Sequence, residues 1–394
     1  MSGLRCTVAA IWILSTVCRA AADFPAFEAV TIDPEIGKVC YAVSLADVNG
    51  DGRVDVVAVS ENRVQWYENP TWAKHVILEN QTALDNVCLA AADIDRDGQL
   101  DFALGAGWTK IGTIQWIARG ADPAAKWNVH EIGVELSTHR MSFADVLGTG
   151  TPQLVVSPLL KSTADGVRLL AFEVPRRPRD EPWRAVVLDA SLNRMHNHTH
   201  VDWNDDGLPE TLVACEQGVF LIERLADGTF RKVLVGSGAA GDRPELRGAG
   251  EIKVGRGPDG ARFLATIEPM HGTHAVVYLP SADGRLPWQR VELDGTLRQG
   301  HAVWTADLTG DGQDEVVIGH REAGPGPVVG PGLYVFQRAE PSGKSWTKHV
   351  IDDGGCAVED ACAADLDGDG RVDLIAGGRA THNVKLYFNR GTKR

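Results

Sequence analysis

The sequence predicts an all-β chain folded as a seven-bladed β-propeller with four-stranded blades, and three observations carry this prediction. An acidic loop that contains glycine recurs along the chain at intervals of 46 to 58 residues, a period typical of propellers and related arrays. Short apolar runs that alternate with polar residues follow the copies, as in β-strands. The chain also contains 43 glycines, which suits a protein rich in turns.

The clearest copy of the loop runs from Asp365 to Asp373. Oxygen-bearing side chains stand at positions 1, 3, 5 and 9, and Gly370 stands at position 6, where a calcium loop of the EF-hand type turns sharply. Apolar segments flank the loop where an EF-hand has helices. We therefore expect the loop to join two strands and to bind calcium.

Five copies keep a complete ligand set, and two are degenerate, one beginning at Asp145 and one near Gly255. We expect five structural Ca²⁺ ions and two empty turns, the alternative being polar β-turns without metal, since Asp and Gly favour turns anyway. The expected calcium ligands are Asp47, Asn49, Asp51, Asp55, Asp93, Asp95, Asp97, Asp101, Asp202, Asn204, Asp206, Glu210, Asp307, Thr309, Asp311, Glu315, Asp365, Asp367, Asp369 and Asp373.

Each repeat continues with two further apolar strands and a fourth that often begins with tryptophan. Six such fourth strands are found for the seven repeats. The repeat that lacks one is the last, which ends near Asn389 after its third strand. The strand over residues 27–33 is therefore expected to complete the last blade and close the ring, which protects the sheet edges. Residues 23–394 read as one domain without a linker.

Residues 1–22 have the pattern of a secretory signal peptide, with Arg5, an apolar run over residues 8–17 and small residues at 20–22. We expect a secreted or periplasmic protein, with an uncleaved anchor as the alternative. The apolar run is too short to span a membrane, and no later stretch qualifies. Five cysteines follow, an odd number lying mostly in apolar strands, so buried free thiols are expected.

The formal net charge of −14 opposes nucleic-acid binding, which requires a basic surface. We expect no nucleic-acid partner, and no membrane partner after signal cleavage. The sequence does not indicate an oligomeric state.

The loops and the strands after them resemble the FG-GAP/VCBS repeat propellers over nearly the whole chain after residue 22. The resemblance implies the propeller fold but not a function, because such propellers include adhesion domains as well as enzymes. It also implies that the strand before each loop is the innermost one and lines a central channel.

Histidines recur at one position of these inner strands. The residues six before each loop start are Tyr41, Val87, His139, His196, Ala249, His301 and Glu359. His198 and Glu251 stand four residues before their loop starts. Because side chains alternate along a strand, these two should point the same way as the residues six before each loop. At ~3.3 Å per residue these groups lie roughly 20 Å from the calcium loops, at the other end of the channel.

The turns after the following strands are expected at that same end. They contribute His271, His274, His320, Arg321 and His382, and we expect all these histidines to converge with Arg140, Glu268 and Glu359. Imidazoles at equivalent places in several blades favour a transition-metal site or general acid/base groups over hydrogen-bonded core residues.

We assign His196, His271 and His301 to Zn²⁺ or another divalent transition metal with an open position for substrate. The expected catalytic residues are His139, His198, His274, His320, Arg321 and Glu359. A metal of this kind polarises a ketone, and a nearby histidine removes the adjacent proton.

Residues 139–145, 195–202, 268–274, 300–304 and 319–322 resemble the propeller domain of the fungal aldos-2-ulose dehydratase/isomerases. The resemblance implies a lyase that eliminates water, or an alkoxide, next to the ketone of a sugar such as an aldosulose or 1,5-anhydrofructose. It therefore also implies a small carbohydrate or oligosaccharide as the partner. That family also has cupin domains linked with isomerisation. These 394 residues hold no counterpart, so the dehydratase step alone is expected.

Two other functions stay open at this point. One is a non-catalytic, calcium-stabilised recognition propeller that binds sugar or protein. The other is a polysaccharide lyase that uses His and Arg without a transition metal. The histidine set separates them, because a binding propeller does not need imidazoles at the same depth in several blades.

Overall fold

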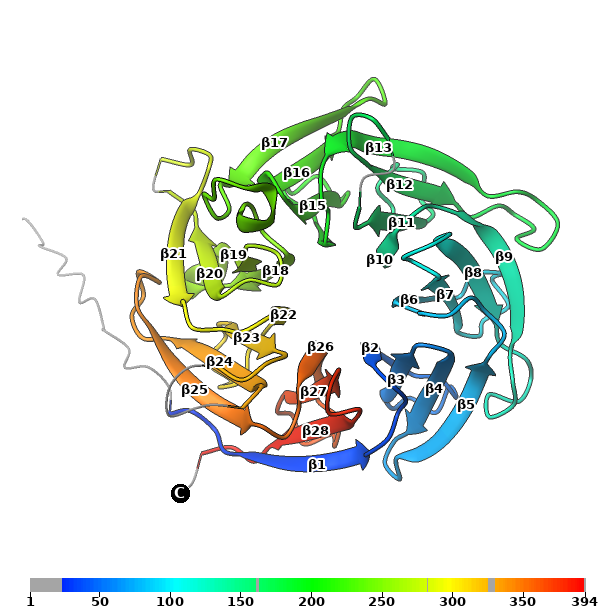
Figure 1. Ribbon diagram of the computed structural model, residues 1–394, viewed down its shortest axis with the longest axis horizontal. Helices are drawn as coiled ribbons and strands as arrows, with labels where there is room; N and C mark the ends of the chain where they lie inside the picture. Colours follow the sequence, from blue (N-terminus) through cyan, green and yellow to red (C-terminus); the bar gives the residue numbers. More distant parts are fainter. Residues whose placement is uncertain (1–22, 161–162, 282, 325–329, 393–394) are drawn as a thin grey trace, which may run out of the picture.

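The computed structural model describes residues 23–160, 163–281, 283–324 and 330–392. The expected signal peptide, residues 1–22, lies outside the described residues. The described strands form seven four-stranded antiparallel sheets set around a ring, which confirms the predicted propeller (Figure 1). Within these ranges no helix has the length and apolarity that crossing a membrane requires.

Each blade adds its strands from the centre of the ring outward. The innermost strands are β2 (Cys40–Ala46), β6 (Cys88–Ala92), β10 (Thr138–Ala144), β14 (Asn197–Val201), β18 (Glu251–Arg256), β22 (Gly300–Ala306) and β26 (Val358–Ala364). The second strands are β3 (Asp55–Ser60), β7 (Asp101–Ala106), β11 (Gln153–Pro158), β15 (Glu210–Cys215), β19 (Arg262–Glu268), β23 (Glu315–His320) and β27 (Asp373–Gly378).

The outer half of each blade is built in the same order. The third strands are β4 (Arg63–Glu68), β8 (Thr113–Ala118), β12 (Val167–Glu173), β16 (Gly218–Arg224), β20 (His274–Leu279), β24 (Gly332–Arg338) and β28 (Val384–Asn389). The outermost strands are β5 (Ala73–Glu79), β9 (Asn128–Val134), β13 (Arg184–Leu192), β17 (Phe230–Gly236), β21 (Gln289–Asp294), β25 (Trp346–Asp353) and β1 (Phe27–Asp33). Two short 3-10 turns, η1 (Pro244–Leu246) and η2 (Pro258–Gly260), flank β18.

The ring closes as predicted, through pairing of the first strand with the last. β1 runs antiparallel to β28, with Phe27 opposite Asn389. The backbone N–H of Ala26 donates to Gly391 O at 2.9 Å, which extends the pairing beyond the strands. Both ends of the described chain therefore hold one blade together, and no first or last blade edge is exposed.

The core consists of apolar layers between neighbouring blades. Val57 and Trp66 of the first blade pack with Phe102, Ile117 and Trp127 of the second, and all five are buried. The ring centroids of Phe102 and Trp127 are 5.4 Å apart. The five described cysteines are buried free thiols, as the sequence predicts.

The acidic loops lie between the first and second strand of each blade, and their first aspartate builds the turn. Asp365 accepts hydrogen bonds from the amides of Gly368 at 2.8 Å and Gly370 at 2.9 Å. In the degenerate loop, Asp145 accepts the amide of Thr149 at 2.9 Å in the same way. This aspartate therefore shapes the turn whether or not the remaining ligand positions are acidic.

Further carboxylates converge in two of the loops. Oxygen atoms of Asp93, Asp95 and Asp101 lie within 4.8 Å of one another, as do those of Asp365, Asp367 and Asp373. The position-9 carboxylate also ties the loop to its blade, since Asp373 accepts the amides of Leu366 at 2.9 Å and Asn389 at 2.7 Å.

Four inner strands carry a β-bulge near the end opposite the loops. The pairing register shifts at Tyr41 in β2, His139 in β10, His301 in β22 and Glu359 in β26. A bulge adds one unpaired residue and re-aims its side chain. The position that the sequence singles out six residues before each loop is thus, in four blades, an irregularity of the strand.

Candidate metal centre

Three histidines from three blades meet at the centre of the ring. His196 directly precedes β14, and its N–H donates to Ala214 O at 3.1 Å. His271 lies in the turn between β19 and β20 with a φ of 54°, and His301 is the bulge residue of β22. One ring nitrogen of each lies within 4.8 Å of the other two. The structure therefore brings together the three residues that the sequence assigns to a transition metal.

Hydrogen bonds to main-chain carbonyls fix which ring nitrogen carries the proton. Nδ1 of His139 lies 3.1 Å from His196 O, Nδ1 of His196 lies 3.1 Å from Gly250 O, and Nδ1 of His301 contacts Glu359 O. A carbonyl oxygen only accepts, so each Nδ1 is the donor and each Nε2 carries a lone pair. Each acceptor belongs to the next blade, so neighbouring blades orient each other's imidazoles.

These Nε2 atoms fit a metal ion. Nε2 of His196 lies 2.8 Å from Nε2 of His271, and buried Nε2 of His301 has no hydrogen-bond partner among the described residues. Three imidazole nitrogens gathered within 4.8 Å of one another suit Zn²⁺ or a similar divalent ion. The only other arrangement for the close pair is a neutral His271 that donates from Nε2 to His196.

Two buried carboxylates flank the histidines. Glu251 Oε1 lies 2.8 Å from His196 Nδ1 and 3.6 Å from Arg140 Nη2. Glu359 Oε1 lies 4.0 Å from His301 Nε2. It accepts hydrogen bonds from Arg321 Nη2 at 2.7 Å and from Arg379 Nη1 at 2.8 Å. Guanidinium groups therefore compensate both buried charges.

Burial keeps the central imidazoles neutral. The pKa values of His139, His196 and His301 are lowered well below the ordinary histidine value, chiefly by desolvation and also by Arg140 or Arg321. Burial also lowers the pKa of His271. Neutral imidazole is the form that binds a metal or accepts a proton, so these groups are in the required form at neutral pH.

His139 and His198 occupy different surroundings. The ring of His139 lies 4.6 Å from that of His196 and 5.6 Å from Trp108. His198 lies within the channel, where its Nε2 is 2.7 Å from Ser142 Oγ and its Nδ1 is 2.8 Å from Ser157 Oγ. Both nitrogens of His198 are thus engaged, whereas Nε2 of His139 has no partner among the described residues.

The expected convergence is wrong for His274, His320 and Glu268. His274 Nδ1 lies 3.1 Å from Glu292 on the outermost strand β21. The ring of His320 packs 4.8 Å from that of Tyr334 on β24. Glu268 is buried inside its own blade, where Arg290 Nε donates to it at 2.7 Å. Successive residues of a strand point to opposite faces, so a place near the correct end does not fix a side chain's direction.

The channel beyond the histidines is a cavity of about 660 Å³ lined by all seven inner strands. Asp360 and Lys253 line it, although sequence alternation had not placed Asp360 there. Asp360 directly follows the bulge residue of β26. The register shift at this bulge cannot be predicted from the sequence, and it changes which side chains face the axis. Trp304 lies under Lys253, whose Nζ is 4.6 Å from the ring centroid. His382 lies at the rim, its Nδ1 2.7 Å from Lys38 O.

Comparisons with known proteins agree with this geometry. Residues 111–281 match the family model of the aldos-2-ulose dehydratase β-propeller domain, and residues 47–104 match that of the FG-GAP-like repeat. The chain is a seven-bladed propeller that resembles FG-GAP-like repeats in one part and the propeller domain of aldos-2-ulose dehydratase in another. The match to the dehydratase domain includes His139, His196 and His271, whereas His301 and Glu359 lie beyond it.

One curated relative is the aldos-2-ulose dehydratase of Phanerodontia chrysosporium, 26% identical over 296 residues. The alignment covers 67% of this chain and 33% of that protein, so the chain spans about a third of the relative's length. The crystal structure of BBS1N in complex with ARL6DN has a TM-score of 0.56 at 12% identity, over 95% of this chain and 99% of that one. At that identity the likeness concerns the fold alone.

Proposed function

We propose that the chain is a secreted, metal-dependent carbohydrate dehydratase that eliminates water next to the ketone of a sugar such as an aldosulose or 1,5-anhydrofructose. The observation that carries the proposal is that one ring nitrogen each of His196, His271 and His301 lies within 4.8 Å of the others, while main-chain carbonyls hold the Nδ1–H groups of His196 and His301. The likeness to the propeller domain of aldos-2-ulose dehydratase supports the same reaction class.

His196, His271 and His301 would hold the metal. A divalent ion such as Zn²⁺ bound there would polarise the ketone oxygen and make the neighbouring C–H more acidic. Glu251 and the main-chain carbonyls would keep the imidazoles in the ligating tautomer.

His139 is the proposed general base. Its ring lies 4.6 Å from that of His196, its Nδ1 is fixed by a carbonyl, and its Nε2 is free to accept the proton from the carbon next to the ketone. The negative charge that develops on the substrate favours the protonated form of His139. His139 then returns this proton to the leaving hydroxyl, which departs as water.

Arg321 is proposed to hold the leaving oxygen. A guanidinium stays charged and donates hydrogen bonds without giving up a proton, and Glu359 fixes its orientation from a buried position. The five complete acidic loops are proposed to bind Ca²⁺ and to stiffen the opposite end of the blades. Residues 1–22 are proposed to direct secretion and then to be removed.

Metal analysis and turnover of the purified protein test this function together. We expect one equivalent of transition metal besides calcium, and conversion of 1,5-anhydrofructose or an aldosulose to an enone detected by ultraviolet absorbance. Calcium alone with no conversion would leave the recognition propeller as the function. Conversion without a transition metal would indicate a metal-independent lyase.

A further inference from the structure

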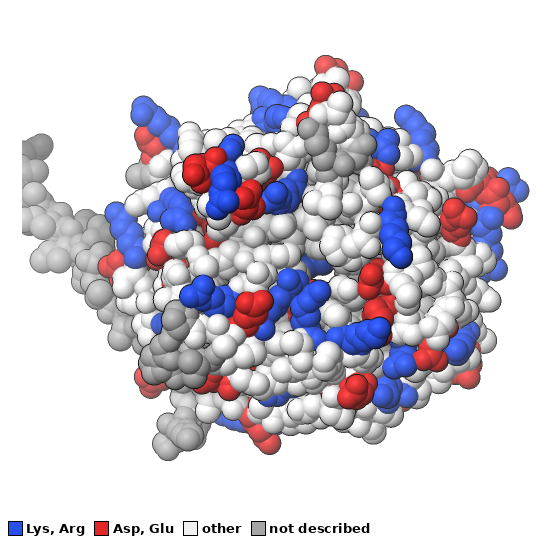
Figure 2. All heavy atoms as spheres, viewed as in Figure 1, with Lys and Arg blue, Asp and Glu red and all other residues white. Residues whose placement is uncertain are grey.

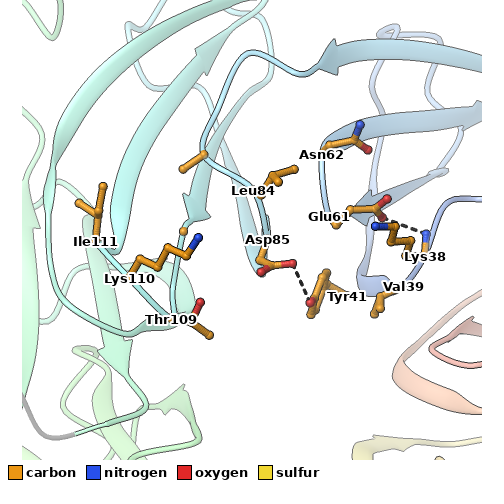
Figure 3. Close-up of a pocket in the computed structure, with 12 residues that line it drawn as sticks. Lys38, Val39, Tyr41, Glu61, Asn62, Leu84, Asp85, Thr109, Lys110 and Ile111 are labelled. Carbon is orange, nitrogen blue, oxygen red and sulfur yellow. Dashed lines mark hydrogen bonds between the residues drawn. The ribbon is translucent and has the colours of Figure 1, made fainter.

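A groove outside the metal centre opens between the first two blades and has a volume of about 690 Å³. Figure 3 shows Lys110 and Ile111 on one side of it, Lys38, Glu61 and Asn62 on the other, and Leu84, Asp85 and Tyr41 between them. The volume falls within the range of about 300–1,000 Å³ usual for ligand sites. None of these residues has a place in the elimination proposed above.

The groove is a built feature, because hydrogen bonds fix its walls to each other. The N–H of Asp85 donates to Glu61 O at 2.8 Å, and the N–H of Gly107 donates to Asp85 O at 3.1 Å. The hydroxyl of Tyr41 donates to Asp85 Oδ1 at 3.0 Å. A ligand would therefore enter a site that is largely formed before binding, which lowers the entropic cost of association.

The groove reaches the metal centre through Tyr41. Tyr41 is the bulge residue of β2 and so occupies, in its blade, the position that His139 and His301 occupy in theirs. The guanidinium of Arg379 lies 5.6 Å from the Tyr41 ring centroid and is hydrogen-bonded to Glu359, which lies 4.0 Å from His301. A ligand that fills the groove therefore extends toward the histidines.

The lining of the groove suits a neutral polyhydroxylated ligand. Its lining contains two lysines, Lys38 and Lys110, and two acids, Glu61 and Asp85. The formal charges of the groove therefore cancel, and it has no excess positive charge that would attract an anionic chain. Neither lysine forms an ion pair among the described residues, so both ammonium groups are free to donate. Leu84 and Ile111 are 67% and 55% exposed, although large apolar side chains are usually covered. Hydrogen-bonding groups beside apolar surface match the hydroxyl edge and the C–H face of a sugar ring.

A second hollow lies beside the groove. A hollow of about 510 Å³ shares Lys38 and Val39 with the groove and includes Arg321, Arg379 and His382. Figure 2 shows Lys and Arg side chains gathered around the middle of one face of the ring, with fewer acids between them. Because the two hollows share Lys38 and Val39, they form one continuous depression that leads from the groove to Arg321 and Arg379, the two arginines bound to Glu359.

We propose that the substrate is a neutral glycoside or oligosaccharide, with the keto sugar at the histidines and a second sugar unit in the groove. This inference rests on the proposed function and adds the identity of the leaving group, which is a sugar instead of water. His139 removes the proton next to the ketone, the new C=C bond forms, and the bond from the β-carbon to the glycosidic oxygen breaks. The proton passes to that oxygen, so a sugar departs where a free keto sugar would lose water.

A matched pair of substrates tests the proposal. We would compare kcat/KM for 1,5-anhydrofructose with that for its 4-O-glucosyl derivatives, in both the α and the β linkage, on the full-length metal-loaded protein. We expect at least one disaccharide to exceed the free keto sugar by about tenfold, a ratio that corresponds to about 1.4 kcal/mol. Equal or lower kcat/KM for both disaccharides overturns the groove proposal. No turnover of any of the three overturns the proposed function instead.

Substitutions on the exposed side of the groove test whether the second sugar unit binds there. Lys110→Ala and Ile111→Ser should remove most of the advantage of the disaccharide and leave turnover of 1,5-anhydrofructose unchanged. Lys344→Ala is the matched control, because Lys344 is equally exposed but lies between β24 and β25, outside the groove. If the groove variants match this control with the disaccharide, the second sugar does not bind there and the proposal is wrong.

Discussion

Nε2 of His196 lies 2.8 Å from Nε2 of His271, although the two residues are 75 positions apart and belong to different blades. Two lone pairs at that separation repel, so either His271 donates a proton from its Nε2 or a metal ion binds both nitrogens. His196 uses its only proton at Nδ1 toward Gly250 O. The Nε2 lone pair of His196 is therefore available to a metal ion, which can replace the proton of His271.

Replacement of one of these imidazoles should remove the transition metal without unfolding the protein. His271→Ala is the best variant, because His271 lies in a turn and is only half-buried. Plasma emission spectrometry should show about one equivalent of metal lost, calcium unchanged and turnover abolished. His130→Ala on the outer strand β9 is the control and should keep both metal and turnover. Unchanged metal in His271→Ala would show that the histidines are packing residues.

The carboxylate beside His196 should tune metal affinity. Glu251→Gln keeps the shape of the side chain but removes the negative charge that lies 2.8 Å from His196 Nδ1. Loss of such an outer partner typically weakens metal binding by about 10–100-fold, and a competition titration with a chromophoric chelator measures it. The same change leaves Arg140 without its partner, so the melting temperature should also fall. An unchanged dissociation constant would mean that the Gly250 carbonyl alone orients His196.

Stability should fall in acid because buried histidines stay neutral. Burial lowers the pKa of His198 well below its ordinary value, whereas in the unfolded chain it is about 6.5. Below about pH 6.5 the unfolded chain therefore binds more protons, and the free energy of unfolding drops as the pH falls. Each such histidine contributes up to about 1.4 kcal/mol per pH unit.

Buried carboxylates act in the opposite direction, since burial raises the pKa of Asp360 to about 6. The comparison of wild type with His198→Asn isolates one histidine from these groups. The wild type should lose its stability advantage over the variant as the pH is lowered from about 7.5 to about 5 in urea denaturation. A constant difference between the two proteins across this range would mean that His198 binds a proton as readily in the folded as in the unfolded chain.

Calcium should stabilise the fold through the complete loops only. A site occupied at a hundred times its dissociation constant adds about 2.7 kcal/mol to the free energy of unfolding, so a chelator should lower the melting temperature by many degrees. Asp367→Ala should lose one calcium, because Asp367 belongs to a converging carboxylate set.

Thr149→Ala in the degenerate loop is the matched control and should keep the calcium content, since that loop lacks the other acids. Equal calcium content in wild type and Asp367→Ala would show that the acidic loops are turns without metal.

The architecture and the depth of the site along the channel follow from the repeat pattern of the chain. The repeat period predicts seven blades, the unpaired segment at residues 27–33 predicts closure with β28, and counting from each loop places His139, His196 and His301 at one depth. These conclusions need only a fixed rise per residue and a repeated unit, both of which are local properties of the chain.

Which side chains face one another depends on how the strands pair and pack. Bulges at His139 and Glu359 break the strict alternation of the inner strands and re-aim their side chains, as the sequence cannot show. His274 and His320 lie near the correct end of their strands, yet one pairs with Glu292 and the other packs on Tyr334. Direction at a strand end depends on pairing with neighbouring strands, which is a non-local contact, and no spacing along the chain encodes it.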